Sequence, residues 1–145
     1  MVEDADFEAQ SQNRSVRIVE SESIFLEGNE ELLRSAIENV VRNAAKYTQE
    51  ETEVEISLKR EMAGNESFGL IRVRDHGQGV PESELTELFR PFYRVEESRD
   101  RQTGGIGLGL AIAGEAVRWH DGSIRAVNAA DVGLMVEIRL PIVAA

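Results

Sequence analysis

The sequence predicts an α+β fold in which strands and helices share one domain. Several short segments alternate apolar and polar residues with the period of two that is typical of half-buried strands. Two longer segments repeat apolar residues every three to four positions, as an amphipathic helix does. The chain has 145 residues, of which 41% are hydrophobic, and this is enough apolar material for one core. We therefore expect a single domain.

The first third of the chain is expected to form two short strands and a long helix. Residues 16–18 and 24–26 alternate in the manner of strands, with a turn at residues 21–23 between them. Asn29 is a good helix N-cap, and the apolar residues after it keep helical spacing to about Tyr47.

The remaining two thirds of the chain mix strand and helix signals. The expected elements are a hairpin of strands 54–58 and 68–73, a short helix from Pro81 to about Leu88, a helix over 106–120, and closing strands at 123–128 and 134–140. The segment from Arg90 to Thr103 has charges of both signs and no apolar period, which predicts a mobile loop.

Composition and charge exclude several classes of function. The net charge of -11 disfavours sequence-independent binding to nucleic acid or to anionic membrane surfaces, so a bound phosphate would need a local cluster of positive groups. The absence of cysteine excludes disulfides, thiolate metal sites and a cysteine nucleophile. Since no apolar run approaches about 18 residues and no signal sequence opens the chain, we expect a cytoplasmic protein or a cytoplasmic piece of one.

Three polar residues, Asn39, Asn43 and Lys46, lie on one stripe of the first long helix. Asparagine is a poor helix former, because its amide competes for backbone hydrogen bonds. A solvated polar face is the simpler interpretation of this stripe. The alternative is that the amide oxygens are ligands for Mg²⁺, with Lys46 holding a phosphate as a point charge.

Two glycine-containing segments have the residue types that a nucleotide site needs. In residues 75–79 an aspartate and two glycines follow a strand; a buried carboxylate could accept a hydrogen bond from the adenine amino group, although many surface turns have the same pattern. Residues 104–110 place four glycines at a helix start, where free N–H groups attract phosphate oxygens; a flexible hinge is the alternative. Neither a P-loop nor a Rossmann fingerprint is present.

Two further features remain undecided on the residues alone. Residues 88–94 place three aromatic side chains beside two arginines, and such a cluster is more often core packing than a ligand site. The two histidines, His76 in a glycine turn and His120 near a helix end, do not have the setting of a phosphoacceptor.

Taken in order, four segments resemble the N, G1, F and G2 boxes of sensor histidine kinases. These segments are residues 38–47, 75–79, 88–94 and 104–110, and the likeness extends over about residues 24 to 141. The resemblance implies the Bergerat ATP-binding fold of the GHKL superfamily. This fold is a two-layer α/β sandwich, in which a mixed sheet of about five strands has about three helices on one face and an ATP lid, here at residues 95–105.

The resemblance also implies roles for individual side chains. Asn43, helped by Asn39, is expected to bind Mg²⁺. Lys46 and Arg94 are expected to contact phosphates, Tyr47 to line the adenine pocket, and Asp75 to accept a hydrogen bond from the adenine amino group. Glu38 matches the position of the base that prepares the acceptor histidine. The remaining residues of the expected ATP site are Gly77, Gly79, Val80, Thr103, Gly104, Gly105, Ile106, Gly107, Leu108, Gly109 and Leu110.

These expectations define a domain and its partners. Residues 1–15 are expected to be a remnant of the linker to a helical hairpin that carries the phosphoacceptor histidine, and residues 16–145 to be the catalytic and ATP-binding domain of an inner-membrane sensor. This chain would bind Mg-ATP without phosphorylating itself, and the full kinase would pass the phosphate to a response regulator. The alternatives are a serine kinase of the anti-sigma type and an ATP-gated dimerisation module like those of gyrase and Hsp90.

Overall fold

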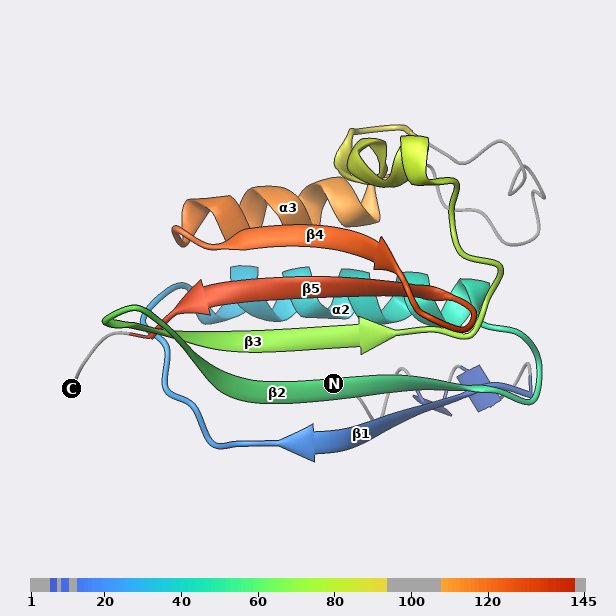
Figure 1. Cartoon of the computed structure of the whole chain (residues 1–145), viewed down its shortest axis with the longest axis horizontal. Coiled ribbons are helices and arrows are strands. Elements are labelled where there is room, and N and C mark those ends of the chain that lie inside the picture. Colours follow the sequence, from blue (N-terminus) through green and yellow to red (C-terminus); the bar gives the residue numbers. More distant parts are fainter. Residues whose placement is uncertain (1–5, 8, 11–12, 94–107, 143–145) are drawn as a thin grey trace.

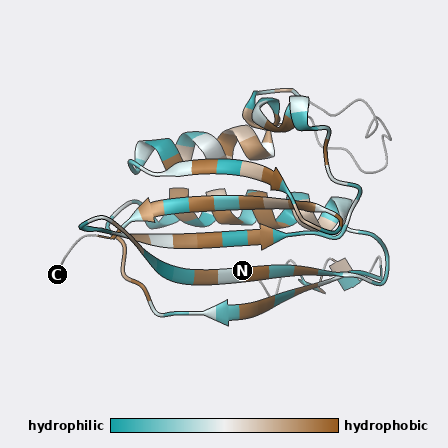
Figure 2. Ribbon diagram, in the orientation of Figure 1, coloured by the Kyte–Doolittle hydropathy of each residue, from teal (hydrophilic) through white to brown (hydrophobic). Residues whose placement is uncertain are grey.

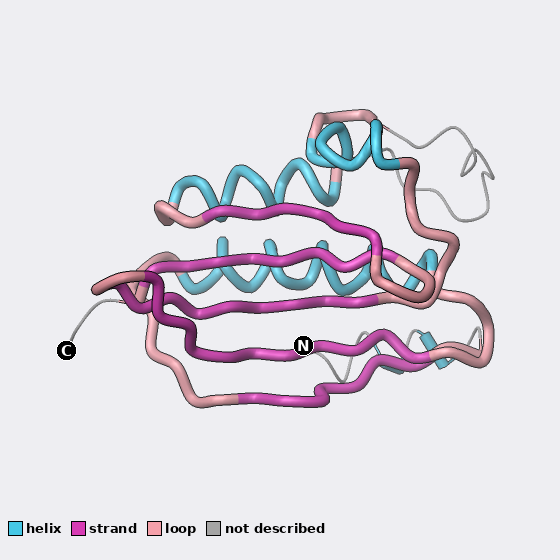
Figure 3. Tube along the Cα trace, in the orientation of Figure 1, coloured by secondary structure: helices cyan, strands magenta, loops and turns pink. Residues whose placement is uncertain are grey.

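The computed structural model describes residues 6–7, 9–10, 13–93 and 108–142. Within these residues, five strands form one mixed sheet in the order β1-β2-β3-β5-β4 (Figure 3). They are β1 (Ser15–Ser21), β2 (Glu53–Ala63), β3 (Glu66–Arg74), β4 (Ser123–Asn128) and β5 (Leu134–Pro141). Strand β1 runs parallel to β2, and the other neighbouring pairs are antiparallel.

The helices form a second layer on one face of the sheet. Helices α2 (Glu30–Tyr47) and α3 (Gly109–Trp119) lie side by side behind the strands, and the 3-10 helix η1 (Glu82–Phe89) lies beside the start of α3 (Figure 1). The strands alternate hydrophobic and hydrophilic residues, and the apolar residues of one face pack on the helices (Figure 2). The core includes Val41, Val54, Val73, Val117 and Ile138, all exposed by 1% or less. The predicted two-layer α+β sandwich is confirmed.

A histidine joins the two helices at the end where α2 begins and α3 finishes. The Asn29 side chain caps α2 by accepting from the Leu32 N–H at 3.0 Å. His120 Nδ1 lies 2.7 Å from the Ala116 carbonyl oxygen, which can only accept, so Nδ1 has the proton. His120 Nε2 accepts from the Asn29 N–H at 2.9 Å. Each ring nitrogen of His120 therefore has a structural partner.

The helix-free face of the sheet holds a buried carboxylate. Glu137 on β5 is 4% exposed and lies opposite Arg72 on β3 and Arg125 on β4. Its two oxygens accept from Arg72 Nε at 2.9 Å and from Arg125 Nε at 2.6 Å. Burial alone would raise the pKa of Glu137, but the hydrogen bonds from the two guanidinium groups outweigh burial and lower it. The carboxylate therefore links three neighbouring strands.

Some element predictions were wrong or imprecise. Residues 24–26 form no strand; the side chains of Ile24 and Leu26 instead lie over Gly69 of β3, while Phe25 is 84% exposed. The apolar alternation thus comes from a segment that covers the edge of the core, although its backbone does not pair with a strand of the sheet. The short helix after Pro81 is a 3-10 helix. The last helix, expected over 106–120, runs from Gly109 to Trp119, with Leu108 as its N-cap residue and His120 as its C-cap residue.

The described residues near the N-terminus contact the domain. Ala9 is 5% exposed and belongs to the core, and the Asp6 carboxylate accepts from the Val16 N–H of β1 at 2.8 Å. Assignment of residues 1–15 to a linker stays a prediction. Among the helices of the described residues, none has the length and apolar character that crossing a membrane requires.

Candidate functional site

One end of the sandwich gathers the predicted motifs. Helix α2 finishes there, the loop after β3 leaves the sheet there, β4 turns into β5 there, and α3 begins there (Figure 1). This follows from the topology, because β3 and β4 both run toward this end and are each antiparallel to β5. Segments that are far apart in sequence therefore meet around residues 75–80.

Asp75 is held at this end by reciprocal bonds to β5. The Asp75 N–H donates to the Leu134 carbonyl at 2.9 Å, and Asp75 Oδ1 accepts from the Leu134 N–H at 3.1 Å and from the Gly77 N–H at 2.9 Å. The residue is only 3% exposed. Burial outweighs these hydrogen bonds and raises the pKa of Asp75 above its ordinary 3.8. Both bonds from Gly77 and Leu134 go to Oδ1, and within the described part of the chain no hydrogen bond reaches Oδ2.

The glycines of the 75–79 motif are needed because neighbouring groups approach the backbone closely. A Cβ at Gly77 would lie 2.3 Å from the Tyr47 carbonyl oxygen at the end of α2. A Cβ at Gly79, where φ is +77°, would lie 2.7 Å from Asn128 Oδ1. The two glycines therefore let the loop pack closely against the end of α2 and the end of β4.

Thr48, which the sequence did not single out, connects the loop of residues 75–80 to the end of α2. It follows the last residue of α2, is 0% exposed, and its Oγ1 accepts from the His76 N–H at 3.0 Å and lies 2.7 Å from Thr52 Oγ1. The bond to His76 spans 28 positions in the sequence. A threonine after a helix is too common to have signalled this role.

Asn128, at the end of β4, is a second residue that the sequence analysis missed. Its Oδ1 accepts from the Val80 N–H at 2.9 Å and its Nδ2 donates to the Val80 carbonyl at 2.6 Å. This pair of bonds to one peptide fixes Val80, a predicted site residue whose side chain packs against the core. No local pattern indicates such a contact, because the partners lie 48 residues apart.

We expect Asn128→Ala to lower the free energy of unfolding by about 1–2 kcal/mol, since it leaves both polar groups of Val80 without their partner. The loop that follows Asp75 would also loosen. Asn65→Ala, in the exposed β2–β3 turn, is a matched control that should have little effect. Urea titration of both variants measures the difference, and equal midpoints for the two would contradict the assigned role of Asn128.

The polar stripe on α2 divides into different environments. Asn39 Nδ2 donates to the Ser35 carbonyl at 2.9 Å, and Asn39 Oδ1 faces the start of α3, 3.3 Å from the point that a Cβ of Gly109 would occupy. Asn43 is half-buried, Lys46 is exposed, and Glu38 is half-buried. The stripe is therefore not a uniformly solvated face.

The described part of residues 88–94 only partly packs into the core. Leu88 and Phe89 pack against the core, whereas Phe92 is 70% exposed with a φ of +66°. The Tyr93 hydroxyl donates to the Glu84 carboxylate of η1, and this bond raises the pKa of Tyr93 to about 12. Core packing thus accounts for Phe89 but not for the exposed Phe92.

The phosphate-binding prediction falls mostly outside the described residues. Arg94, Thr103, Gly104, Gly105, Ile106 and Gly107 lie outside them. The structure describes Leu108 as the residue before α3, Gly109 as its first residue, and Leu110 as a core residue that is 8% exposed.

The described residues offer few donors for a metal ion. Among the residues that the structure describes, no group of three or more His, Asp or Glu side chains could hold a metal ion. The half-buried amide of Asn43 offers a hard, neutral oxygen. One such oxygen fits a Mg²⁺ ion that takes its other ligands from phosphates and water, and it does not fit an all-protein cage.

Sequence comparison defines the class. The pattern of the HATPase_c family, described as histidine kinase-, DNA gyrase B- and HSP90-like ATPases, matches residues 28–144. The chain belongs to this family. Among curated relatives, it is 38% identical to the sensor histidine kinase CpxA of Escherichia coli K12 over 144 residues. It is also 39% identical to the sensor protein kinase WalK of Staphylococcus haemolyticus over 126 residues.

These matches cover most of this chain and a minor part of each relative. They span 98% of the chain but 30% of CpxA, and 87% of the chain but 20% of WalK. The chain thus corresponds to the ATPase portion of these sensor proteins.

Solved structures agree with the fold. The mycobacterial sensor histidine kinase MprB has a TM-score of 0.79 at 23% identity, covering 99% of this chain and 95% of that one. Full-length ShkA in complex with AMPPNP has a TM-score of 0.80 at 23% identity, covering 99% of this chain and 29% of ShkA. The ATP binding domain of PrrB from Mycobacterium tuberculosis has a TM-score of 0.72 at 26% identity, covering 99% and 92%. The five-stranded sheet with helices on one face is therefore the fold of histidine kinase ATPase domains.

Proposed function

We propose that this chain is the catalytic domain of a sensor histidine kinase, which binds Mg-ATP and transfers the γ-phosphoryl group to a histidine on a helical hairpin domain. The main support is Asp75, a buried carboxylate whose Oδ1 is held by backbone donors, while Oδ2 has no hydrogen bond from the described residues. Such an oxygen can accept a hydrogen bond from the amino group of adenine. A solved structure with the same fold was crystallised with AMPPNP, an ATP analogue.

The phosphate end of the nucleotide would lie toward α2 and the start of α3. Asn43 and Asn39 would hold Mg²⁺, Lys46 and Arg94 would contact phosphates, and the segment from Thr103 to Leu110 would place backbone N–H groups around them. When bound, Mg²⁺ neutralises phosphate charge. Phosphoryl transfer otherwise needs mainly positioning, with Glu38 as the base toward the acceptor histidine.

The acceptor histidine would lie in a partner domain. Both histidines of this chain have structural bonds at their rings: His120 to Ala116 and Asn29, and His76 to Glu53 and Glu55. The partners would be the hairpin domain and, through it, the receiver domain of a response regulator. The chain would then be a cytoplasmic part of an inner-membrane sensor. CpxA and WalK, both sensor kinases, match over most of this chain and favour this function over an anti-sigma serine kinase or a dimerisation module.

Titration calorimetry with ATP, with and without Mg²⁺, tests the proposal. The chain should bind ATP more tightly with Mg²⁺, and Asn43→Ala should remove most of that gain while leaving Mg-free binding unchanged. Losing one metal ligand should weaken Mg-ATP binding by roughly tenfold or more, since about 1.4 kcal/mol corresponds to tenfold. Asn65→Ala, in the distant hairpin turn, is the control. Equal Mg²⁺ dependence in Asn43→Ala and the control would refute the metal site.

The kinase step needs a separate assay. The chain is mixed with a histidine-containing hairpin domain from a related sensor kinase and γ-labelled ATP. Label should enter the hairpin and not this chain, and Glu38→Gln should slow the transfer more than it weakens ATP binding. Label on this chain itself would contradict the proposal.

A further inference from the structure

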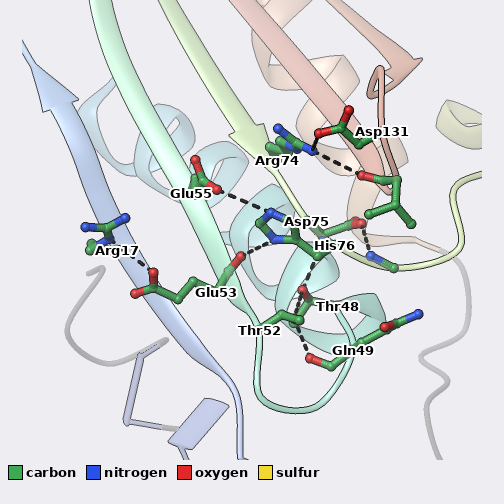
Figure 4. Close-up of polar contacts among 12 residues, drawn as sticks. Arg17, Thr48, Gln49, Thr52, Glu53, Glu55, Arg74, Asp75, His76 and Asp131 are labelled. Carbon is green, nitrogen blue, oxygen red and sulfur yellow. Dashed lines mark hydrogen bonds and ion pairs between the residues drawn. The ribbon is translucent and has the colours of Figure 1, made fainter.

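The loop that holds Asp75 has a histidine whose ring the proposed function does not use. Figure 4 shows His76 between strand β2 and the end of α2, on the opposite side of the chain from the Asp75 carboxylate. Its Nδ1 lies 2.6 Å from the Glu53 carbonyl oxygen, and its Nε2 lies 3.3 Å from Glu55 Oε1. The side chain is 24% exposed, so both contacts are partly shielded from water.

The Glu53 contact lies where the β2–β3 ladder stops. The last residue pair of that ladder is Glu55 with Arg74, so two further positions of the same register would place His76 opposite Glu53. The His76 N–H, however, donates to Thr48 Oγ1 at 3.0 Å. The imidazole ring thus connects the departing chain to β2 after the backbone pairing has ended. Since a carbonyl oxygen can only accept, Nδ1 has a proton and donates it.

These contacts hold the residue next to Asp75 from two sides. Thr48 fixes the His76 backbone to the end of α2, and the ring fixes the side chain to β2. Strand β2 is itself tied to β1, because Arg17 Nε lies 3.3 Å from Glu53 Oε1. On the other side of Asp75, Leu134 supplies the bonds to β5. Rotation of the peptide between Asp75 and His76 would have to break one of these contacts.

We propose that His76 is a positioning residue for adenine recognition, which aims the Asp75 carboxylate through the bond from its Nδ1 to the Glu53 carbonyl. This inference rests on the proposed role of Asp75. A carboxylate displaced by a fraction of a hydrogen-bond length loses much of its discrimination between the amino group of adenine and the carbonyl group of guanine. His76 therefore acts on nucleotide specificity without contacting the nucleotide.

Two polar substitutions separate the ring contacts. In His76→Asn the side-chain amide takes the place of Nδ1 and can still donate to Glu53, whereas in His76→Gln the amide takes the place of Nε2 and can reach only Glu55. Calorimetric titration with Mg-ADP and with Mg-GDP measures affinity and base discrimination in each variant. We expect the ADP affinity of His76→Asn to stay within about twofold of that of the unchanged chain. His76→Gln should bind ADP about tenfold more weakly, because it loses the equivalent of one hydrogen bond. The ADP-to-GDP preference should shrink only in His76→Gln.

The other histidine provides the control for stability. His120 also forms two structural hydrogen bonds, but at the opposite end of the helices. His120→Gln should lower the melting temperature and leave ADP affinity unchanged. Thermal melts of all variants distinguish a loss of stability from a displacement of the Asp75 carboxylate in a folded chain.

The ADP affinities of these variants distinguish a failure of the inference from a failure of the proposed function. Equal ADP affinity in His76→Gln and the unchanged chain would overturn the inference, as would equal weakening in His76→Asn and His76→Gln. Asp75→Asn, titrated in parallel, reports on the proposed function itself. If Asp75→Asn binds ADP normally, adenine recognition by Asp75 is wrong; if it loses ADP while the two His76 variants do not differ, only the positioning role is wrong.

Discussion

Replacing Asp75 with asparagine is expected to abolish ADP binding without destabilising the fold. The asparagine oxygen can take the place of Oδ1 and keep accepting from the Gly77 and Leu134 N–H groups. Its NH₂ group then replaces the other oxygen, so a donor faces the amino group of adenine where an acceptor stood. A lost bond and an unpaired buried donor together should weaken ADP binding by roughly 100-fold or more.

The fold itself should become somewhat more stable in Asp75→Asn, because burial of the ionised carboxylate opposes folding at neutral pH. Because folding raises the pKa of Asp75, the protonated carboxyl favours the folded state. This contribution to stability is fully present below about pH 3.8 and is lost as pH rises through the folded-state pKa. The stability advantage of Asp75→Asn should therefore shrink as pH falls. ADP binding to the unchanged chain should weaken over the same fall, because the protonated carboxyl is a poorer acceptor.

Glu137→Gln is the matched control, since Glu137 is the other acid of the described residues that is almost fully buried. It lies on the helix-free face and accepts from Arg72 and Arg125. Its pKa is lowered, so its contribution to stability is present above about 4.5 and is lost as pH falls through the folded-state pKa. Glu137→Gln should therefore destabilise the chain at neutral pH and leave ADP affinity unchanged. Asp75→Asn should thus lose ADP affinity without losing stability, whereas Glu137→Gln should lose stability and keep its ADP affinity. Titration calorimetry measures the affinities, and urea unfolding measures the stabilities.

Local patterns predicted most of the fold. The Asn29 cap with helical spacing placed α2, and strand alternation with turn residues placed β2, β3, β4 and β5. These features depend on neighbours within a few positions, which is the range that sequence patterns report. Residues 24–26 show the limit: alternation reveals that Ile24 and Leu26 face the core, but not whether the backbone between them pairs with another strand.

The parts of the site that could not be predicted are contacts between distant segments. Thr48 holds His76 across 28 positions, Asn128 holds Val80 across 48, and Leu134 holds Asp75 across 59. Threonine, asparagine and leucine at these positions have no distinctive pattern, because each acts through one backbone partner brought near by the topology. The motif supplies the groups that would meet the nucleotide, and unremarkable residues on other elements fix them in place.

Replacing Gly133 with alanine is expected to have the largest effect on stability. Gly133 lies in the turn between β4 and β5, has a φ of +97°, and a Cβ there would lie 2.0 Å from the Asp75 carbonyl oxygen. That carbonyl belongs to a backbone held by Leu134, so it cannot move away cheaply. The left-handed backbone costs about 1–2 kcal/mol and the overlap about 1–3 more. We expect a loss of about 2–5 kcal/mol in the free energy of unfolding, measured by urea titration.

Gly64→Ala separates the two contributions. Gly64 lies in the β2–β3 turn at a φ of +64°, and no atom lies within 4 Å of the point that its Cβ would occupy. It should therefore show the backbone cost alone, about 1–2 kcal/mol. The excess cost at Gly133 then measures how closely the β4–β5 turn packs on Asp75. An excess near zero would mean that the β4–β5 turn can move away from the Asp75 carbonyl, and that the close approach of Gly133 does not help to fix the loop.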